Sequence, residues 1–133
     1  MGILIDTSVF IRAERAGIEV LDPLRSNPDD TLLLSVITAS ELLHGVWRAT
    51  DAGVRAKRNA FVEAVFREFP MVDIDVAVAR VHAQIWAEQM ATGRMIGTHD
   101  LWLAATCIAH GFRIATANVR EFARIGGLEV QAL

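Results

Sequence analysis

The sequence has little of what would tie it to a membrane or an oxidising compartment. Its only cysteine is Cys107, which excludes a disulfide within the chain and is typical of a reducing cytoplasm. No apolar run approaches the roughly 20 residues that a membrane-spanning helix needs. The first residues contain neither a basic stretch nor a cleavage site, so we expect no signal peptide and no membrane partner.

A surplus of basic residues is missing as well. Thirteen Lys and Arg stand against 16 Asp and Glu, for a net charge of −3. A protein that held nucleic acid by bulk charge would be basic, so any such binding must depend on local arginines or on metal ions that bridge to phosphates. Small basic groups do occur at Arg12 and Arg15, at Arg48, and in the segment RAKR at 55–58. We interpret RAKR as a solvated helix face.

Strand and helix patterns alternate along the 133 residues, of which 53% are hydrophobic. The length and composition indicate one globular domain, 1–133. The alternation predicts a three-layer α/β/α sandwich around a mostly parallel central sheet. The expected strands are 3–5, 31–36, 71–74, 112–116 and 128–133, and the expected helices are 8–16, 38–50, 54–69, 76–92, 97–111 and 118–125.

The first acidic residue comes directly after an apolar strand. Ile3, Leu4 and Ile5 show no polar alternation, as in a strand buried on both faces, and Asp6 follows them. Asp6, Thr7 or Ser8 is in position to cap the helix that begins there. Alternatively, Asp6 lies at the carboxyl end of a central parallel strand, where open α/β sheets bind their ligands.

Other polar side chains are expected at the same edge of the sheet. Glu41 is placed in the first turn of the helix after the second strand, and Asp100 in the first turn of the helix 97–111. Asn118 and Glu121 follow the fourth strand. Strand ends and the helix starts that follow them share one edge of a parallel sheet, which predicts that these residues meet Asp6 there.

Each of these acids also has a structural alternative. Thr38 and Glu41 have the spacing of a capping box. Asp100 would favour the positive end of its helix, and Glu121 would pair with Arg120 or Arg124. Taken singly, none of the acids distinguishes a functional site from local stabilisation.

Four segments taken together resemble the PIN-domain ribonucleases, and most closely the VapC-type toxins of bacterial toxin–antitoxin systems. They are ILIDTSVFI, the Glu of ITASELLHG, GTHDLWLAA and IATANVREF, and they occur in this order over nearly the whole chain. The resemblance implies a parallel sheet flanked by helices and an acidic pocket that holds Mg²⁺ or Mn²⁺. It also implies cleavage of RNA, a homodimer, and an antitoxin that blocks the pocket.

The chemistry of the acids agrees with this resemblance. Clustered carboxylates repel one another unless a cation compensates, and Mg²⁺ or Mn²⁺ prefers such oxygen ligands. We expect Asp6 and Asp100 to bind the metal directly and Glu41 to position or deprotonate the attacking water. Ser8 is expected either to hydrogen-bond a ligand carboxylate or to cap the helix.

The sequence departs from the family pattern at one position. Many relatives carry an acid after the fourth strand where this chain has Asn118, and an amide adds no negative charge. Glu121, one helical turn further on, is able to replace part of that charge. We therefore expect one well-bound metal ion in the absence of RNA, with a second joining only when the RNA phosphate contributes ligands.

Two other kinds of protein remain open. A phosphatase of the haloacid dehalogenase type also begins with Asp after a strand, but it needs a second Asp where this chain has Ser8. A non-catalytic binding module would keep the fold and work only through its partner. Among the aromatic residues, Trp47 and Trp102 are expected to pack inside the protein. An apolar stripe on the helix 76–92, which Asp75 is expected to cap, is expected to be core or dimer surface; its residues are Val78, Val81, His82, Ile85, Trp86 and Met90.

Overall fold

The computed structural model describes all residues, 1–133, and its centre is a parallel sheet of five strands in the order β3-β2-β1-β4-β5. The strands are β1 (Gly2–Ile5), β2 (Thr31–Ser35), β3 (Met71–Val72), β4 (Arg113–Thr116) and β5 (Val130–Ala132). Every neighbouring pair is parallel, which confirms the α/β prediction. Because β1 is central, the acid that follows it emerges at the middle of the sheet's carboxyl edge.

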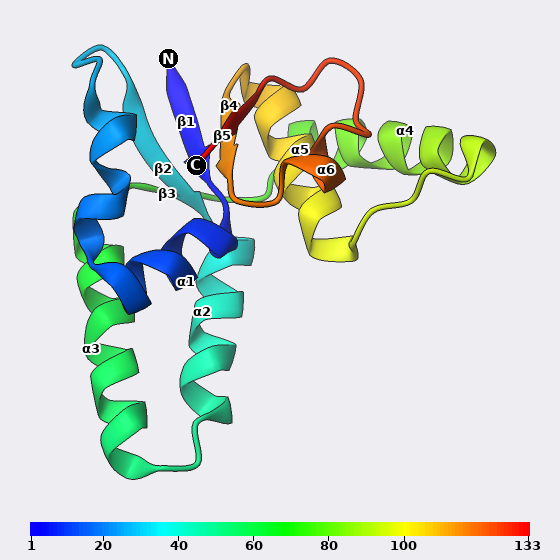
Figure 1. The fold of residues 1–133 in the computed structure, drawn as a ribbon. Helices are drawn as coiled ribbons and strands as arrows, with labels where there is room; N and C mark the ends of the chain where they lie inside the picture. The colour runs from blue at the N-terminus through cyan, green and yellow to red at the C-terminus, as the bar shows by residue number, and fades with distance from the viewer.

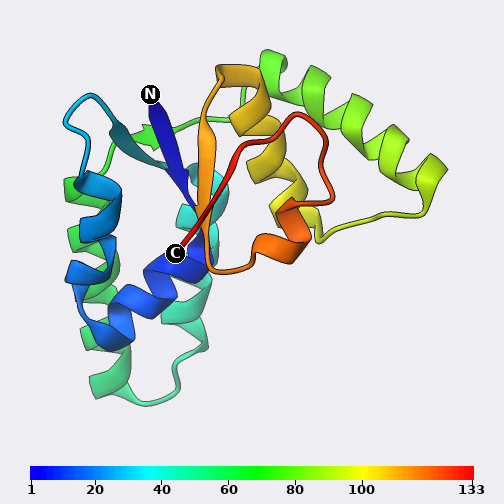
Figure 2. The same ribbon diagram turned by 45° about the horizontal axis from the view of Figure 1, so that its top comes forward.

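Helices cover both faces of the sheet (Figures 1 and 2). They are α1 (Thr7–Ala16), the 3₁₀ helix η1 (Ile18–Arg25), α2 (Val36–Arg48), α3 (Ala52–Glu68), α4 (Val76–Thr92), α5 (Thr98–His110) and α6 (Val119–Phe122). The first four pack over one face around one apolar cluster, and α4, α5 and α6 pack over the other around a second cluster. The result is the predicted three-layer arrangement.

The absence of polar alternation in β1 follows from its place between these layers. Ile3 and Ile5 belong to the first apolar cluster and Leu4 to the second, and all three side chains are fully buried. A strand with a helical layer on each face has no solvent side, so each of its positions is apolar.

The start of α2 corrects the sequence prediction. The helix begins at Val36 rather than at 38, because Ser35 caps it by accepting a 3.0 Å hydrogen bond from the Ile37 amide. Thr38 is therefore already inside the helix, and the predicted capping box with Glu41 is wrong. Glu41 lies in the second turn, not the first, so capping does not account for its presence.

Other helix ends agree with the sequence. Asp75 caps α4 by accepting a 3.0 Å hydrogen bond from the Val78 amide. Gly93 and Gly111, with φ of 68° and 70°, end α4 and α5 in the left-handed conformation that glycine allows. The 3₁₀ helix η1 was not predicted, because its Pro23 and short apolar spacing resemble a turn. No helix is both long enough and apolar enough to span a membrane.

Candidate functional site

Asp6 is held at the carboxyl end of β1 by two hydroxyl groups. Its Oδ2 accepts hydrogen bonds of 2.6 Å from Ser8 and 2.8 Å from Thr116. Asp6 stands at the N-cap position of α1, but its side chain accepts no hydrogen bond from that helix, so the capping alternative does not describe it. Its Oδ1 has no hydrogen-bond partner within the chain, and the residue is 4% exposed. One carboxylate oxygen is thus fixed and the other is free for a ligand.

Backbone amides orient both hydroxyl groups. The Ala117 amide donates to Ser8 Oγ at 3.1 Å, and the Asn118 amide donates to Thr116 Oγ1 at 2.8 Å. Each hydroxyl oxygen accepts a hydrogen bond from a backbone amide and donates its own proton in a hydrogen bond to Asp6. The hydrogen bond expected from Ser8 to a candidate ligand is present, and Thr116 adds a second that was not predicted.

Glu41 is brought to the start of α1 by a neighbour of Asp6. Thr7 Oγ1 donates a 2.8 Å hydrogen bond to Glu41 Oε1. The other carboxylate oxygen, Oε2, lies 3.5 Å from Nδ1 of His99, the residue before Asp100. Glu41 is thereby tied to the segments that carry both other acids, as the parallel-sheet argument predicts.

Asp100 lies in the first turn of α5, and its pKa reports its acidic neighbours. Burial and then the charges of Asp6, Glu41 and Glu121 raise this pKa from the usual value to about 6, against a smaller lowering by His99. The charges of the other three carboxylates therefore reach Asp100. Their mutual repulsion is what a bound cation would relieve.

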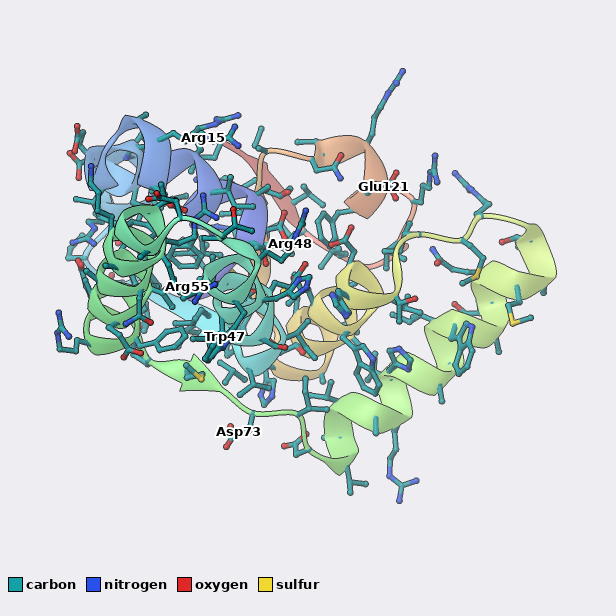
Figure 3. All side chains as sticks on the ribbon, turned by 90° about the horizontal axis from the view of Figure 1, so that it is seen from below. Arg15, Trp47, Arg48, Arg55, Asp73 and Glu121 are labelled. Carbon is teal, nitrogen blue, oxygen red and sulfur yellow. The ribbon has the colours of Figure 1, made fainter.

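Asn118 and Glu121 complete the edge at α6. Asn118 is exposed and its side chain makes no hydrogen bond, although its backbone amide orients Thr116. Glu121 lies 4.0 Å from Arg124, so the ion pair named as its structural alternative is present. Its charge nevertheless contributes to the raised pKa of Asp100. Figure 3 shows Glu121 on α6, on the face seen from below.

The donor set fits a hard divalent cation that keeps much of its water. No group of three or more His, Cys, Asp or Glu side chains is in position to hold a metal ion by itself. Mg²⁺ is commonly bound by one or two carboxylates together with waters and substrate phosphates, and it does not need a full protein cage. The free Oδ1 of Asp6 and the carboxyl of Asp100 meet that requirement.

Residues outside the acidic cluster are excluded from its chemistry. Cys107 is fully buried, and burial raises the pKa of its thiol, so it is not a nucleophile. His82 stacks on Trp102 at 3.5 Å between ring centroids, which confirms the packing expected for this tryptophan. The prediction failed for Trp47, whose side chain is 75% exposed.

Sequence reasoning missed Thr7 and Thr116 as supports of the acids. The available signal was their position, because both are hydroxyl residues at or directly after a strand end. Thr116 is fully buried, and it ends β4 as Asp6 follows β1. Its partner is 110 residues away in the sequence, a separation that no local pattern reveals.

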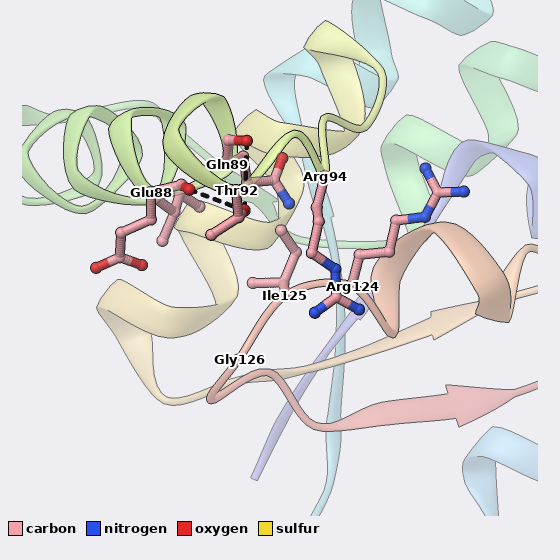
Figure 4. A pocket seen from close by; sticks show the side chains of 8 residues that line it. Glu88, Gln89, Thr92, Arg94, Arg124, Ile125 and Gly126 are labelled. Carbon is pink, nitrogen blue, oxygen red and sulfur yellow. Dashed lines mark hydrogen bonds between the residues drawn. The ribbon is translucent and has the colours of Figure 1, made fainter.

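A pocket lies at the C-terminal end of α4, away from the acidic site residues (Figure 4). Its wall includes Gln89, whose Oε1 accepts from the Ile96 amide at 3.2 Å, and Thr92, which donates to the Glu88 carbonyl at 3.0 Å. Arg94 and Arg124 lie at its edge. None of the candidate site acids lines this pocket, so it is not part of the site described here.

Comparisons with known proteins agree with one another. The family model described as "PIN domain" matches residues 3–128. The chain is 36% identical over 130 residues to "Ribonuclease VapC1" of Rickettsia felis, covering 98% of this chain and 95% of that protein. It is 32% identical to "tRNA(fMet)-specific endonuclease VapC" of Shigella flexneri over 75% of this chain and 74% of that protein. A solved structure of VapBC-5 from Mycobacterium tuberculosis, described as a member of the VapBC family of toxin–antitoxin systems, superposes with a TM-score of 0.77 at 29% identity, covering 99% of this chain and 97% of the other.

Proposed function

This chain belongs to the PIN-domain family, and from that premise we propose that its acidic site hydrolyses RNA with the help of a bound Mg²⁺ or Mn²⁺ ion. Its full-length relatives are VapC ribonucleases, so the chain is an endoribonuclease and the toxin of a toxin–antitoxin system. The observation that carries the metal proposal is Asp6, which has one oxygen locked by two hydroxyls and the other free beside an Asp100 of raised pKa.

Asp6 and Asp100 are the residues that would hold the ion. When bound, a divalent ion supplies positive charge for the scissile phosphate and lowers the pKa of a water that attacks it. Ser8 and Thr116 fix the orientation of the Asp6 carboxylate, which lowers the cost of ordering it on binding. Thr7 holds Glu41 through Oε1, and its Oε2, which faces the exposed His99, would orient the attacking water or accept its proton.

The partners follow from the same premise. We propose that the RNA and a cognate antitoxin protein bind at this acidic edge, and that the antitoxin inhibits cleavage by covering it.

We also propose a homodimer formed through α4, because this helix leaves large apolar side chains in solvent: Val76 is 67%, Trp86 48% and Met90 66% exposed.

The phosphatase alternative lacks its general acid. Ser8 occupies the position that would need a second Asp, and its hydroxyl is already committed to Asp6. The non-catalytic alternative predicts that the acidic residues are dispensable.

Both alternatives are tested by incubating structured RNAs with the protein and Mg²⁺, Mn²⁺ or EDTA. The digestion is then repeated with the Asp6→Asn variant. We expect cleavage only with metal and only with the native residue; equal cleavage in EDTA, or by the variant, would refute the metal site.

A further inference from the structure

Trp47 is a large apolar side chain that the fold leaves in water. It lies in the last turn of α2 and is 75% exposed, the highest exposure among the three tryptophans. The guanidinium of Arg55 lies 5.9 Å from the centre of its ring. Arg55 is itself fixed, because its Nε and Nη2 donate to the Ala49 carbonyl at 3.0 and 2.6 Å. The result is an exposed aromatic ring with a hydrogen-bonded guanidinium group held next to it.

A groove between α1, α2 and α3 runs from Arg48, the residue after Trp47, to Glu41 of the acidic site. Glu41 lines the groove together with Arg15 and Arg48. Arg58, also on its wall, is tied to Glu14 at 2.9 Å and to the Gly45 carbonyl at 3.1 Å. Arg58 is therefore part of the wall rather than the solvated residue predicted from RAKR.

The side chains of Arg15 and Arg48 make no hydrogen bond or ion pair within the chain. Both residues are exposed. Figure 3 shows Arg15 of α1, Arg48 and Trp47 of α2, and Arg55 of α3 on the face seen from below. We refer to these four residues as the Trp47 row.

The charge of this region is opposite to that of the whole chain. Residues 47–58 contain four basic and one acidic side chain, whereas the chain carries a net charge of −3. Cationic guanidinium groups complement phosphates, and an exposed indole complements the face of a base. Trp47 lies six residues, or about 9 Å along the axis of α2, from Glu41, on a different side of that helix. A nucleotide near the scissile bond is within that reach.

We propose that the Trp47 row binds a single-stranded segment of the RNA, with an unpaired base stacked on Trp47 and the flanking phosphates held by Arg15 and Arg48. The inference rests on the proposed ribonuclease function and narrows its substrate to RNA with unpaired bases beside the cleavage site. A paired base lies inside its helix and offers no free face, so a duplex does not satisfy Trp47. Arg55 lies over one face of the indole, so the base stacks on the opposite face.

The test separates binding from cleavage. Asp6→Asn is used as the parent so that the RNA stays intact, and fluorescence anisotropy measures its affinity for a labelled unstructured 12-nucleotide RNA and for a matched blunt duplex. Adding Trp47→Ala is expected to weaken single-strand binding at least about ten-fold, and adding Trp47→Phe to restore most of it. Duplex binding should change less than two-fold in either variant.

A charge control completes the design. Arg48→Ala is expected to weaken binding to all single strands and to lower the slope of log affinity against log salt by about one. Arg67→Ala removes the same charge from exposed α3 outside the Trp47 row and should leave affinity within two-fold. Equal losses of RNA affinity in Arg48→Ala and Arg67→Ala would show that binding depends only on the total positive charge, and would overturn the proposal.

The possible failures are distinguishable. A native chain that cleaves no RNA with metal would remove the proposed function. A native chain that cleaves RNA, combined with a Trp47→Ala variant that binds single strands as well as its parent, would overturn the Trp47 row alone. A Trp47→Ala variant of lower mass in light scattering would also overturn it, because Trp47 would then be a contact between protein chains.

Discussion

Thr116 donates a 2.8 Å hydrogen bond to Oδ2 of Asp6 and so joins the carboxyl ends of two adjacent strands, β4 and β1. The bond aims the free Oδ1 in one direction, since the carboxylate can no longer rotate about its last torsion without breaking it. The Asn118 amide donates to the same hydroxyl, so residue 118 supports Asp6 through its backbone whatever its side chain.

Replacing Thr116 with Val is expected to raise the metal concentration needed for half-maximal cleavage by about 10- to 100-fold, the usual cost of losing a residue that orients a metal ligand. Val keeps the shape but removes the donor. The measurement is the RNA cleavage rate against Mg²⁺ concentration. Thr106→Val, which removes a buried hydroxyl that donates to the Trp102 carbonyl, serves as the control. An unchanged metal requirement in Thr116→Val would contradict the orienting role.

Asp6→Asn and Asp100→Asn are each expected to abolish metal-dependent cleavage while the fold persists. The amide keeps the size of the side chain but removes an anionic oxygen ligand and relieves repulsion within the cluster. Gel-based RNA cleavage at matched metal concentration measures the first effect, and circular dichroism the second. Residual cleavage at the native rate by either variant would exclude that residue as a ligand.

Without metal, Asp100→Asn is expected to stabilise the protein in a pH-dependent manner. The folded-state pKa of about 6 lies above the usual value of an aspartate side chain, so ionisation of Asp100 destabilises the fold. The gain from the variant is therefore greatest above pH 6, falls as pH drops through this range, and vanishes below about pH 4. Because solvent screens this partly exposed group, we expect the variant to raise the free energy of unfolding by roughly 1 kcal/mol at pH 8. Thermal unfolding in EDTA at pH 4, 6 and 8 measures it, and a gain that grew toward acid pH would disprove the assignment.

The site is expected to bind one metal ion in the absence of RNA. Titration calorimetry with Mn²⁺ should give a stoichiometry near one per chain, and Asn118→Asp should raise the affinity by adding a negative charge next to Thr116. Asn59→Asp, on exposed α3, makes the same charge change elsewhere and should have no effect. Two equally occupied ions on the native chain, or no gain from Asn118→Asp, would refute this expectation.

The chain is expected to form a two-fold symmetric dimer through α4. Light scattering at micromolar concentration should give twice the chain mass, and Met90→Glu should give the monomer by placing a charge on the contact. Met71→Glu, at another exposed apolar position on β3, should leave the dimer intact. A monomeric mass for the native chain would exclude this interface.

The sequence predicted the site through one geometric rule, that the ends of parallel strands meet at one edge. That rule placed Asp6, Glu41 and Asp100 together although each has a local structural alternative. It failed on Glu41's position in α2, because Ser35 and Thr38 are both competent caps and only the direct passage of β2 into the helix selects Ser35. It gave no information on Thr116, because the hydrogen-bond partner of this residue is 110 residues away in the sequence. It also did not predict the exposure of Trp47, which depends on which surfaces the folded chain leaves uncovered.

The hydrogen bond from Thr116 to Asp6 also affects when the protein becomes active during its synthesis. A growing chain contains Asp6 and Glu41 early, but the strand that holds Asp6 in place is made only near residue 116 and must insert beside β1, since the sheet order is β3-β2-β1-β4-β5. Contacts of such long sequence separation form late in folding. A ribosome translating this message therefore carries a nascent chain without a formed nuclease site for most of its synthesis.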